Sequence, residues 1–430
     1  MKAEERTGRI HFILHPSSFI LLILLGCAGA DDGKTRIEFW ALGREGEEVV
    51  KLVREFEKLN PTIAVDVQQM PWTAAHEKLL TAIVGESTPD VAQIGNSWIP
   101  EFHAINAIAD LSLFARSLDQ RDYFSGVWRT NEVEGVLYGI PWYVDTRVLF
   151  YRRDLLAAVG YPEGPKTWSQ WLDACAKLKA RGTPWPILLP TNEWAQPITF
   201  GLQQEARFLR DRGRYGAFSD PSFLRALDFY FEFFRRGYAP IMTAGQVANQ
   251  YQQFGEGDIA MFVGGPWQIG EVKRRLPASF QTRWNTAALP APDGKTWPGA
   301  SLAGGGSLVI FSRSQKKEAA WKLIEFLSQP EHQVRFYDLT GDLPARRVAW
   351  NAPSVAGDPY LTAFRVQLEN VVPTPDVPQW EQIVTAVFDV ADMAIRRRLS
   401  PREAAATLDR RTDAMLEKRR WMLAREESGR

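Results

Sequence analysis

The sequence has almost no cysteine: Cys27 and Cys175 are the only two among 430 residues. Cys27 directly follows the N-terminal apolar run, whereas Cys175 lies far along the chain, so a disulfide framework is excluded. Histidine is also scarce, and only His76, His103 and His332 lie outside the first 26 positions. Because these three are far apart, a zinc site of the usual Cys/His type is not expected. Neither a metal ion nor another cofactor is predicted.

The chain also lacks a surplus of charge of either sign. Lys and Arg together number 51, Asp and Glu together number 51, and the formal net charge is zero. Nucleic-acid binding usually needs a basic surplus, so no nucleic-acid partner is expected. Hydrophobic residues make up 45% and charged residues 24%, which excludes a largely disordered chain and a polytopic membrane protein. The length is sufficient for two to three domains.

Tryptophan, in contrast, is abundant, with 16 residues in the chain. Its side chain offers a large flat apolar surface and one N–H donor, and it is a favoured contact residue in binding sites. The excess therefore points to a site that holds a ligand between aromatic surfaces.

Residues 1–26 have the pattern of an export signal. Basic residues precede an apolar run over 19–25, which is too short for a comfortable membrane span of about 20 residues. The run ends in LLGC at 24–27, which resembles the lipobox of bacterial lipoproteins, where Cys27 would be acylated. We expect a lipoprotein signal peptide and a periplasmic or cell-surface protein that touches the membrane through this anchor only. The alternative is an uncleaved membrane anchor with a chance cysteine.

Strand and helix patterns alternate from Thr35 onward. Apolar residues in the segment 45–59 recur at helical spacing, whereas those in 63–67 alternate as in a half-buried strand. Further strands are predicted at 37–40 and 91–94, and a further helix at 74–84. This order favours an α/β fold with a parallel sheet covered by helices.

A second α/β region follows. Thr167 and Gln170 fit a capping box that opens a helix to about 180, and Ser400 and Glu403 fit another that opens the last long helix. A helix that begins at Pro221 carries a predicted buried stripe of Phe223, Leu224, Leu227, Tyr230, Phe231 and Phe234. The remaining predicted elements are strands at 146–151, 257–263 and 307–311 and helices at 154–159 and 318–327.

Four motifs stand in a recognisable order. They are TPDV at 88–91, GIPWYVDTRVLFYRRDLLAAVGYPEGPKTW at 139–168, FGEGDIAMFVGGPW at 254–267, and a segment over 289–333 that contains GGG at 304–306. Together they resemble the extracellular solute-binding proteins of family 1, the sugar-capturing subunits of bacterial ABC importers, similar to maltose- and trehalose-binding proteins. The resemblance spans about residues 35–420.

The resemblance implies an α/β, two-lobe periplasmic-binding-protein (type II) fold with two or three interlobe crossings. We expect the crossings near 141–145, 301–306 and 344–349. The N-terminal lobe would comprise 35–143 plus 303–345, and the C-terminal lobe 144–302 plus 346–420. A ligand would sit in the cleft, and the lobes would close over it.

The candidate ligand-binding residues stand mainly at strand ends and predicted crossings. Ligands of doubly wound sheets bind outside the carboxyl ends of the strands, and a sugar needs flat aromatic surfaces with complete hydrogen-bonding partners. Two of the candidates also have a structural interpretation. Trp98 could fill the core of a lobe, and Asp145 could form a hinge salt bridge with Arg147. The predicted set is Gly43, Arg44, Asn96, Trp98, Trp142, Asp145, Arg147, Glu193, Trp194, Trp267, Gly304, Gly305 and Arg346.

These observations predict the substrate-binding receptor of an ABC importer for a small neutral saccharide. The run from 66 to 98 most resembles α-glucoside receptors, so maltose or trehalose is the leading ligand. Two alternatives stay open: a binder of another solute, such as a polyol phosphate or a polyamine, and a glycoside hydrolase that uses Asp145 and Glu193. No other catalytic signature occurs, so an enzyme is not expected. The expected partners are the saccharide and the permease transmembrane subunits, and the chain is expected to be a monomer.

Overall fold

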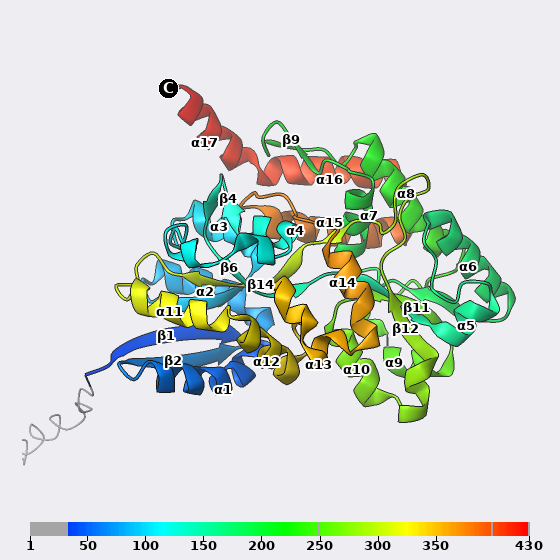
Figure 1. The fold of residues 1–430 in the computed structure, drawn as a ribbon. Coiled ribbons are helices and arrows are strands. Elements are labelled where there is room, and N and C mark those ends of the chain that lie inside the picture. The colour runs from blue at the N-terminus through cyan, green and yellow to red at the C-terminus, as the bar shows by residue number, and fades with distance from the viewer. Residues whose placement is uncertain (1–32, 248, 397–398, 429–430) are drawn as a thin grey trace, which may run out of the picture.

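A computed structural model describes residues 33–247, 249–396 and 399–428. The predicted signal peptide 1–26 and Cys27 lie outside these residues. Two α/β lobes stand side by side, the first on the left of Figure 1 and the second on the right. Within the described part of the chain, no helix has the length and apolar character needed to cross a membrane.

The first lobe is built on a six-stranded mixed sheet with the order β15-β6-β14-β3-β1-β2. Strands β1, β2 and β3 are mutually parallel, whereas β14 runs antiparallel to both β3 and β6. The predicted parallel unit is therefore present, with an antiparallel extension. The strands are β1 (Thr35–Leu42), β2 (Ile63–Met70), β3 (Val91–Gly95), β6 (Ile140–Asp145), β14 (Gly304–Ile310) and β15 (Leu343–Pro344).

Helices cover both faces of this sheet. The buried stripe of α1 (Gly43–Leu59), which includes Val49, Leu52 and Phe56, packs on one face with α11 (Lys317–Leu327) and α12 (Pro330–Thr340). The other face is covered by α2 (Trp72–Val84) and α3 (Ile99–Ala104) through Leu79 and Phe102. The helical spacing predicted in 45–59 and 318–327 thus marks the faces that the sheet buries.

The second lobe is built on a four-stranded sheet with the order β12-β7-β11-β8. A second core of aromatic and aliphatic side chains lies between this sheet and its helices. The strands are β7 (Val148–Arg152), β8 (Trp185–Leu188), β11 (Ile259–Gly264) and β12 (Trp284–Ala287). The helices of this region are α5 (Arg153–Ala158), α6 (Trp168–Ala180), α7 (Ala195–Gln203), α8 (Pro221–Arg235), α9 (Gln250–Glu256), α10 (Trp267–Arg275), α14 (Thr362–Leu368), α15 (Trp380–Ile395) and α16 (Pro401–Met415).

The predicted stripe on α8 is too narrow. Phe229 and Phe233 are buried as well, because Trp171 of α6 and Phe200 of α7 pack against them. The ring of Phe229 stacks on Trp168 of α6, with 3.8 Å between ring centroids. Helix α8 is therefore central to the second core, and a narrow side with Arg225, Asp228 and Arg235 stays exposed.

The two predicted capping boxes have different outcomes. Ser400 and Glu403 cap α16 reciprocally, as predicted. Thr167 accepts the N–H of Gln170, but the Gln170 side chain accepts the N–H of Lys166 at 2.8 Å instead of that of Thr167. The helix begins where it was predicted, with only half of the expected capping box.

The chain passes between the sheets at several points. It leaves the first sheet after β6 and enters the second at β7, and it returns through β13 (Ser301–Leu302) into β14. Strand β13 pairs in parallel with β16 (Val371–Val372). In β14, Gly305 has a φ of 140° and lies so close to Tyr143 that a Cβ would stand 2.3 Å from its carbonyl oxygen. Only glycine fits here. The exact lobe boundaries remain a prediction.

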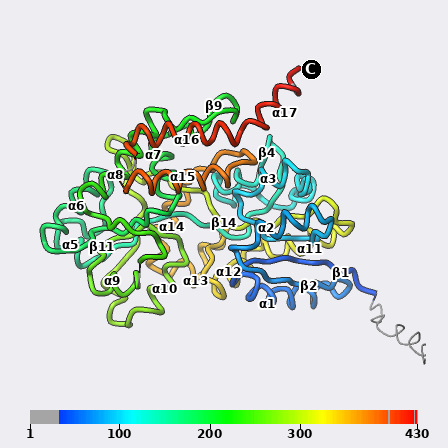
Figure 2. Tube along the Cα trace, turned by 180° about the vertical axis from the view of Figure 1, so that it is seen from behind, coloured from blue at the N-terminus to red at the C-terminus, as the bar shows by residue number. Residues whose placement is uncertain are grey.

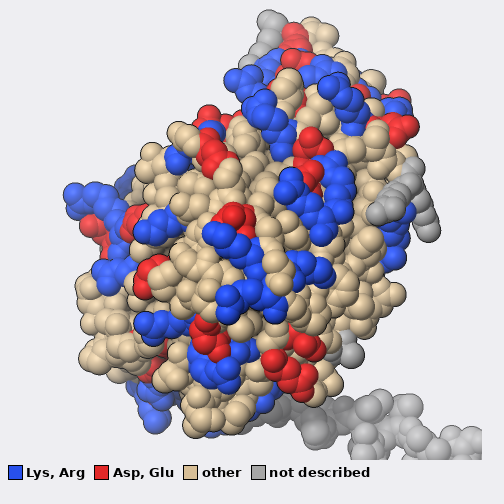
Figure 3. Space-filling model, turned by 90° about the vertical axis from the view of Figure 1, so that its right-hand side faces the viewer, with Lys and Arg blue, Asp and Glu red and all other residues tan. Residues whose placement is uncertain are grey.

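The shorter elements lie around this frame. Helix α17 (Glu417–Ser428) projects from the end of α16, away from the lobes in both views (Figures 1 and 2). The outer face of the second lobe carries positive side chains with negative ones beside them (Figure 3). Ion pairs such as Lys177–Asp173 at 2.6 Å partly neutralise these charges. The remaining elements are α4 (Ser125–Arg129), α13 (Pro353–Ala356) and the pairs β4 (Glu132–Val133) with β5 (Val136–Leu137) and β9 (Leu209–Arg210) with β10 (Tyr215–Gly216).

Candidate functional site

A cleft of about 1100 Å³ is lined by residues of both lobes and of the crossing segments. It lies at the edge where the parallel strands of the first sheet end, which is the position expected for a ligand site in such sheets. Nine of the thirteen predicted site residues line it. They are Arg44, Asn96, Trp98, Asp145, Arg147, Trp194, Trp267, Gly304 and Gly305.

The first lobe contributes two indoles and a carboxylate to the cleft wall. Trp72 begins α2 directly after β2, and Trp98 follows β3, so both stand at the same sheet edge. Their rings meet edge to face, with 5.9 Å between centroids. The indole Nε1 of Trp72 donates to Glu45 Oε1 at 3.1 Å, which fixes the orientation of the ring. This wall is thus a fixed aromatic surface with a carboxylate at its edge.

Strand β6 supplies the part of the wall nearest the crossing. Because side chains alternate along a strand, Tyr143 and Asp145 share one side of it, and both line the cleft. The Tyr143 hydroxyl donates to Glu45 Oε1 at 3.0 Å. Burial and the nearby Glu45 carboxylate raise the pKa of Tyr143, so the phenol stays protonated and remains a donor.

Asp145 and Arg147 form an ion pair in the cleft wall. Nη1 of Arg147 donates to both carboxylate oxygens of Asp145, at 2.8 and 2.7 Å. Burial raises the pKa of Asp145, although the guanidinium of Arg147 acts in the opposite direction. Burial lowers the pKa of Arg147, but Asp145 and Glu193 together raise it above its ordinary value. The ion pair that was given as the alternative role of Asp145 therefore exists, and both of its residues line the cleft.

The second lobe contributes the other two indoles, Trp194 and Trp267. Trp267 begins α10 and is 47% exposed, whereas the other aromatic rings of this cleft are buried or half-buried. The guanidinium of Arg147 lies over its ring, 4.9 Å from the centroid. An indole left so open at a helix start can stack on a ligand.

The end of α12 and the turn after it reach the cleft with Tyr337, Asp338 and Asp342. Burial, reinforced by the Glu45 carboxylate, raises the pKa of Asp342 to about 7. Near neutral pH this carboxyl therefore changes between a hydrogen-bond donor and an acceptor-only group. It can serve a bound molecule in either role.

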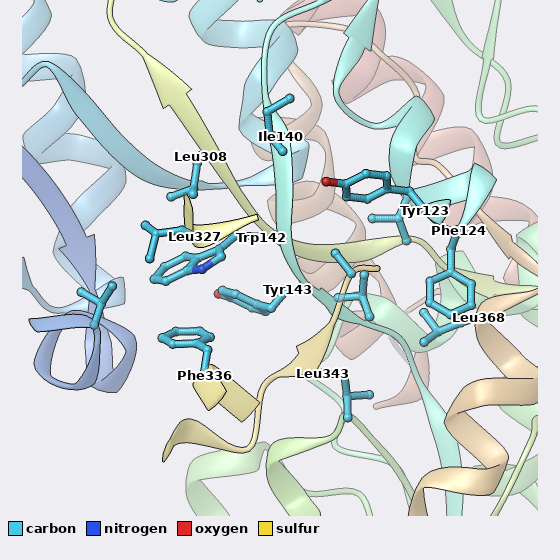
Figure 4. Close-up of a cluster of buried hydrophobic side chains, with 14 of the residues drawn as sticks. Tyr123, Phe124, Ile140, Trp142, Tyr143, Leu308, Leu327, Phe336, Leu343 and Leu368 are labelled. Carbon is cyan, nitrogen blue, oxygen red and sulfur yellow. The ribbon is translucent and has the colours of Figure 1, made fainter. Parts of the chain in front are cut away.

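The prediction that Trp142 faces the ligand is wrong. Its side chain is fully buried, and its ring stacks on Phe336 of α12 with 4.2 Å between centroids (Figure 4). The β6–β14 pairing is irregular at Trp142, and its ring lies beside that of Tyr143, with 5.9 Å between centroids (Figure 4). It fills the core of the first lobe.

Three further predicted residues do not line the cleft. Gly43 has a φ of 51° at the start of α1, and a Cβ there would lie 2.7 Å from the ring of Trp72, so it supports the wall from behind. Glu193 accepts the N–H of Ala195 at 3.1 Å and orders the start of α7. Arg346 pairs with Asp122 and lies over the ring of Tyr123. These three have structural roles.

Sequence reasoning missed several residues that line the cleft. Trp72 carried a usable signal, since it follows β2, which runs parallel to β1. Glu45 stands beside the predicted Arg44 at the end of β1. Asp342 and Glu381 carried no local signal, because only tertiary packing brings α12 and α15 to this edge.

Comparison with known proteins agrees with this architecture. The model of the bacterial extracellular solute-binding protein family matches residues 40–334. The structure of the sugar-binding protein MalE of Xanthomonas citri is 47% identical, with a TM-score of 0.87, and covers 91% of this chain and 99% of its own. Maltodextrin-binding protein MdxE of Bacillus subtilis is 23% identical over 88% of this chain and 92% of its own.

A fourth comparison concerns a solute of different chemistry. The sn-glycerol-3-phosphate-binding periplasmic protein UgpB of Escherichia coli is 24% identical over 84% of this chain and 87% of its own length. The family match covers most of the described fold, and the two-lobe architecture agrees with it. The chain belongs to the bacterial extracellular solute-binding protein family, whose members are binding proteins of ABC transporters and not enzymes.

Proposed function

We propose that the cleft captures a small neutral saccharide for an ABC importer, and that the solute is an α-glucoside disaccharide, maltose or trehalose. The observation that carries the proposal is a set of four indoles, two from each lobe, around a cleft rich in carboxylates. These four are Trp72, Trp98, Trp194 and Trp267.

Indole rings suit the apolar C–H faces of sugar rings, and carboxylates suit their hydroxyl groups. Each buried hydroxyl left without a partner would cost about 1–3 kcal/mol. Glu45, Asp145 and Asp342 supply acceptors, and Asn96 lies among them in the wall. The volume of about 1100 Å³ is at the upper end of ordinary ligand pockets, which leaves room for two or more sugar rings.

The charge of the wall argues against a phosphorylated solute. Seven acidic and four basic side chains line the cleft. Three of the four basic side chains face a carboxylate and the fourth a carbonyl, so little uncompensated positive charge is left to attract a phosphate group. These partners are Leu339 for Arg44, Asp145 for Arg147, Asp358 for Lys273, and Glu271 for Arg274.

The same acidic surplus favours a second candidate, a polyamine. Carboxylates around aromatic rings are a suitable environment for ammonium groups. Against this candidate, the structure that is 47% identical to this chain is that of a protein described as sugar-binding, and MdxE is described as maltodextrin-binding. We therefore place the saccharide first.

Isothermal titration calorimetry tests the proposal. The protein without residues 1–26 is titrated with maltose, trehalose, sn-glycerol 3-phosphate and spermidine. We expect micromolar affinity, about −8 kcal/mol, for at least one of the two disaccharides and none for the phosphate ester. Binding of spermidine alone would favour the polyamine, and binding of the phosphate ester alone would contradict the charge argument.

The cellular setting is part of the same proposal. We expect a monomer, anchored by a lipid on Cys27, that delivers its solute to the transmembrane subunits of a permease. Light scattering on the protein without residues 1–26 gives the oligomeric state. Metabolic labelling with a palmitate analogue should mark the full chain but not its Cys27→Ser variant.

A further inference from the structure

A hydrogen bond joins the lobes beside the cleft. The Ser97 hydroxyl donates to Glu381 Oε1 at 2.6 Å. Ser97 belongs to the short turn Asn96–Trp98 that follows β3 of the first sheet, whereas Glu381 stands in the first turn of α15. Both residues line the cleft.

Each partner is held firmly by its own lobe. Next to Ser97, Asn96 donates through Nδ2 to the Ala303 carbonyl at 2.9 Å and to Thr130 Oγ1 at 3.0 Å. On the other side, Ile383 and Val387 of α15 are fully buried in the second core. The turn therefore follows the first lobe, and α15 follows the second.

The Glu381 carboxylate lies in a partly desolvated position among charged groups of the first lobe. Burial raises its pKa, whereas the Ser97 hydrogen bond and His76 lower it and Glu101 raises it. His76 and Glu101 are themselves paired at 2.7 Å. A carboxylate placed here depends on the Ser97 donor, because a charge without a partner is costly in such surroundings.

We propose that the Ser97–Glu381 hydrogen bond is a closure latch, a contact that holds the lobes together without the participation of the solute. O–H···O bonds require about 2.5–3.0 Å between the oxygen atoms, so separation of the lobes at this point breaks it. Ser97 and Glu381 are then positioning residues and not solute contacts. The inference rests on the proposed capture of a solute in this cleft, but not on which solute is bound.

The latch predicts a characteristic pattern in the variants Ser97→Ala, Glu381→Ala and their combination. Loss of one hydrogen bond should raise the Kd of every bound solute by the same factor, about threefold to tenfold. Ratios of affinity between solutes should stay as in the wild type. The double variant should lose no more affinity than the single variant that binds more weakly, because both single changes remove the same contact.

A second readout needs no solute. In a protein that also lacks Cys27, spin labels at Lys58→Cys in α1 and Arg181→Cys after α6 report the distance between the lobes, because the remaining Cys175 is buried. In the solute-free protein, both single variants should shift this distance to larger values. The matched control is Ser117→Ala, since Ser117 donates to Glu325 at the same 2.6 Å within the first lobe alone. It should change neither readout.

Two results would overturn the latch. One is an unchanged interlobe distance together with unchanged affinities in both single variants. The other is an affinity loss confined to one solute, which would make the two residues solute contacts. If the wild-type protein bound none of the titrated solutes, the proposed function would fail, and the interlobe distance alone would decide on the latch.

Discussion

The guanidinium of Arg147 lies over the ring of Trp267, 4.9 Å from its centroid. The same guanidinium donates to both oxygens of Asp145, the last residue of β6. A crossing segment is thereby connected to an indole of the second lobe. One face of that indole is covered by the cation, and the 47% exposure of the side chain leaves surface for a ligand.

Replacing Trp267 by alanine should weaken sugar binding at least tenfold, because this change removes the most exposed aromatic ring of the cleft. Thermal stability should stay within a few degrees of the wild type. The measurement is calorimetric titration with the disaccharide that binds best. Trp297→Ala is the matched control, since Lys166 lies 5.4 Å from that ring and Trp297 is outside the cleft lining. An equal loss in both variants would contradict the assignment.

The variant Asp145→Ala should also weaken sugar binding at least tenfold. It removes an acceptor from the wall and leaves Arg147 without its ion-pair partner in a buried position. The change Asp154→Ala provides a control, because Asp154 pairs with Arg152 at 2.8 Å with the same spacing along the chain, outside the cleft lining. Unchanged affinity in Asp145→Ala would mean that the solute binds elsewhere.

Trp142→Ala should destabilise the protein by about 3–5 kcal/mol, because it empties a filled position in the core. Trp142→Phe should cost much less, since the ring contact with Phe336 is retained and the buried indole N–H has no hydrogen-bond partner to lose. Urea unfolding measures both. An affinity loss without a stability loss would restore Trp142 as a ligand contact.

The His76–Glu101 pair should make stability depend on pH. The hydrogen bond between His76 and Glu101 is the main reason that the pKa of His76 is raised in the folded protein, although burial of the imidazole acts in the opposite direction. The stabilisation is therefore complete below the unfolded pKa of about 6.5 and disappears as the pH rises through the folded pKa. Because the side chain is partly exposed, we expect about 0.5–1 kcal/mol. The difference in unfolding free energy between the wild type and His76→Gln should be larger at pH 5.5 than at pH 8.5. An equal difference at both values would contradict this.

The sequence predicts β1, β2, β3 and β14 of the first sheet, because these strands have clear patterns, but not β6 and β15, which were expected as crossings. Candidate ligand residues follow the ends of β1 and β3. Arg44, Asn96 and Trp98 were found in this way. Trp142 was assigned to the cleft wrongly, because a crossing strand that is buried on both sides gives no alternation that separates the core side from the cleft side. Glu381 and Asp342 were missed for another reason, since their positions depend on how distant segments pack.

Strand β14 lies between β3 and β6 in the first sheet, although it is made from Gly304–Ile310. While the ribosome works through the intervening residues, β3 and β6 each have an edge whose backbone groups lack the neighbour they will finally have. Such edges invite association with other chains. The first sheet therefore stays incomplete until this late segment is made, and a gene fragment that stops short of β14 should yield aggregate instead of a folded first lobe.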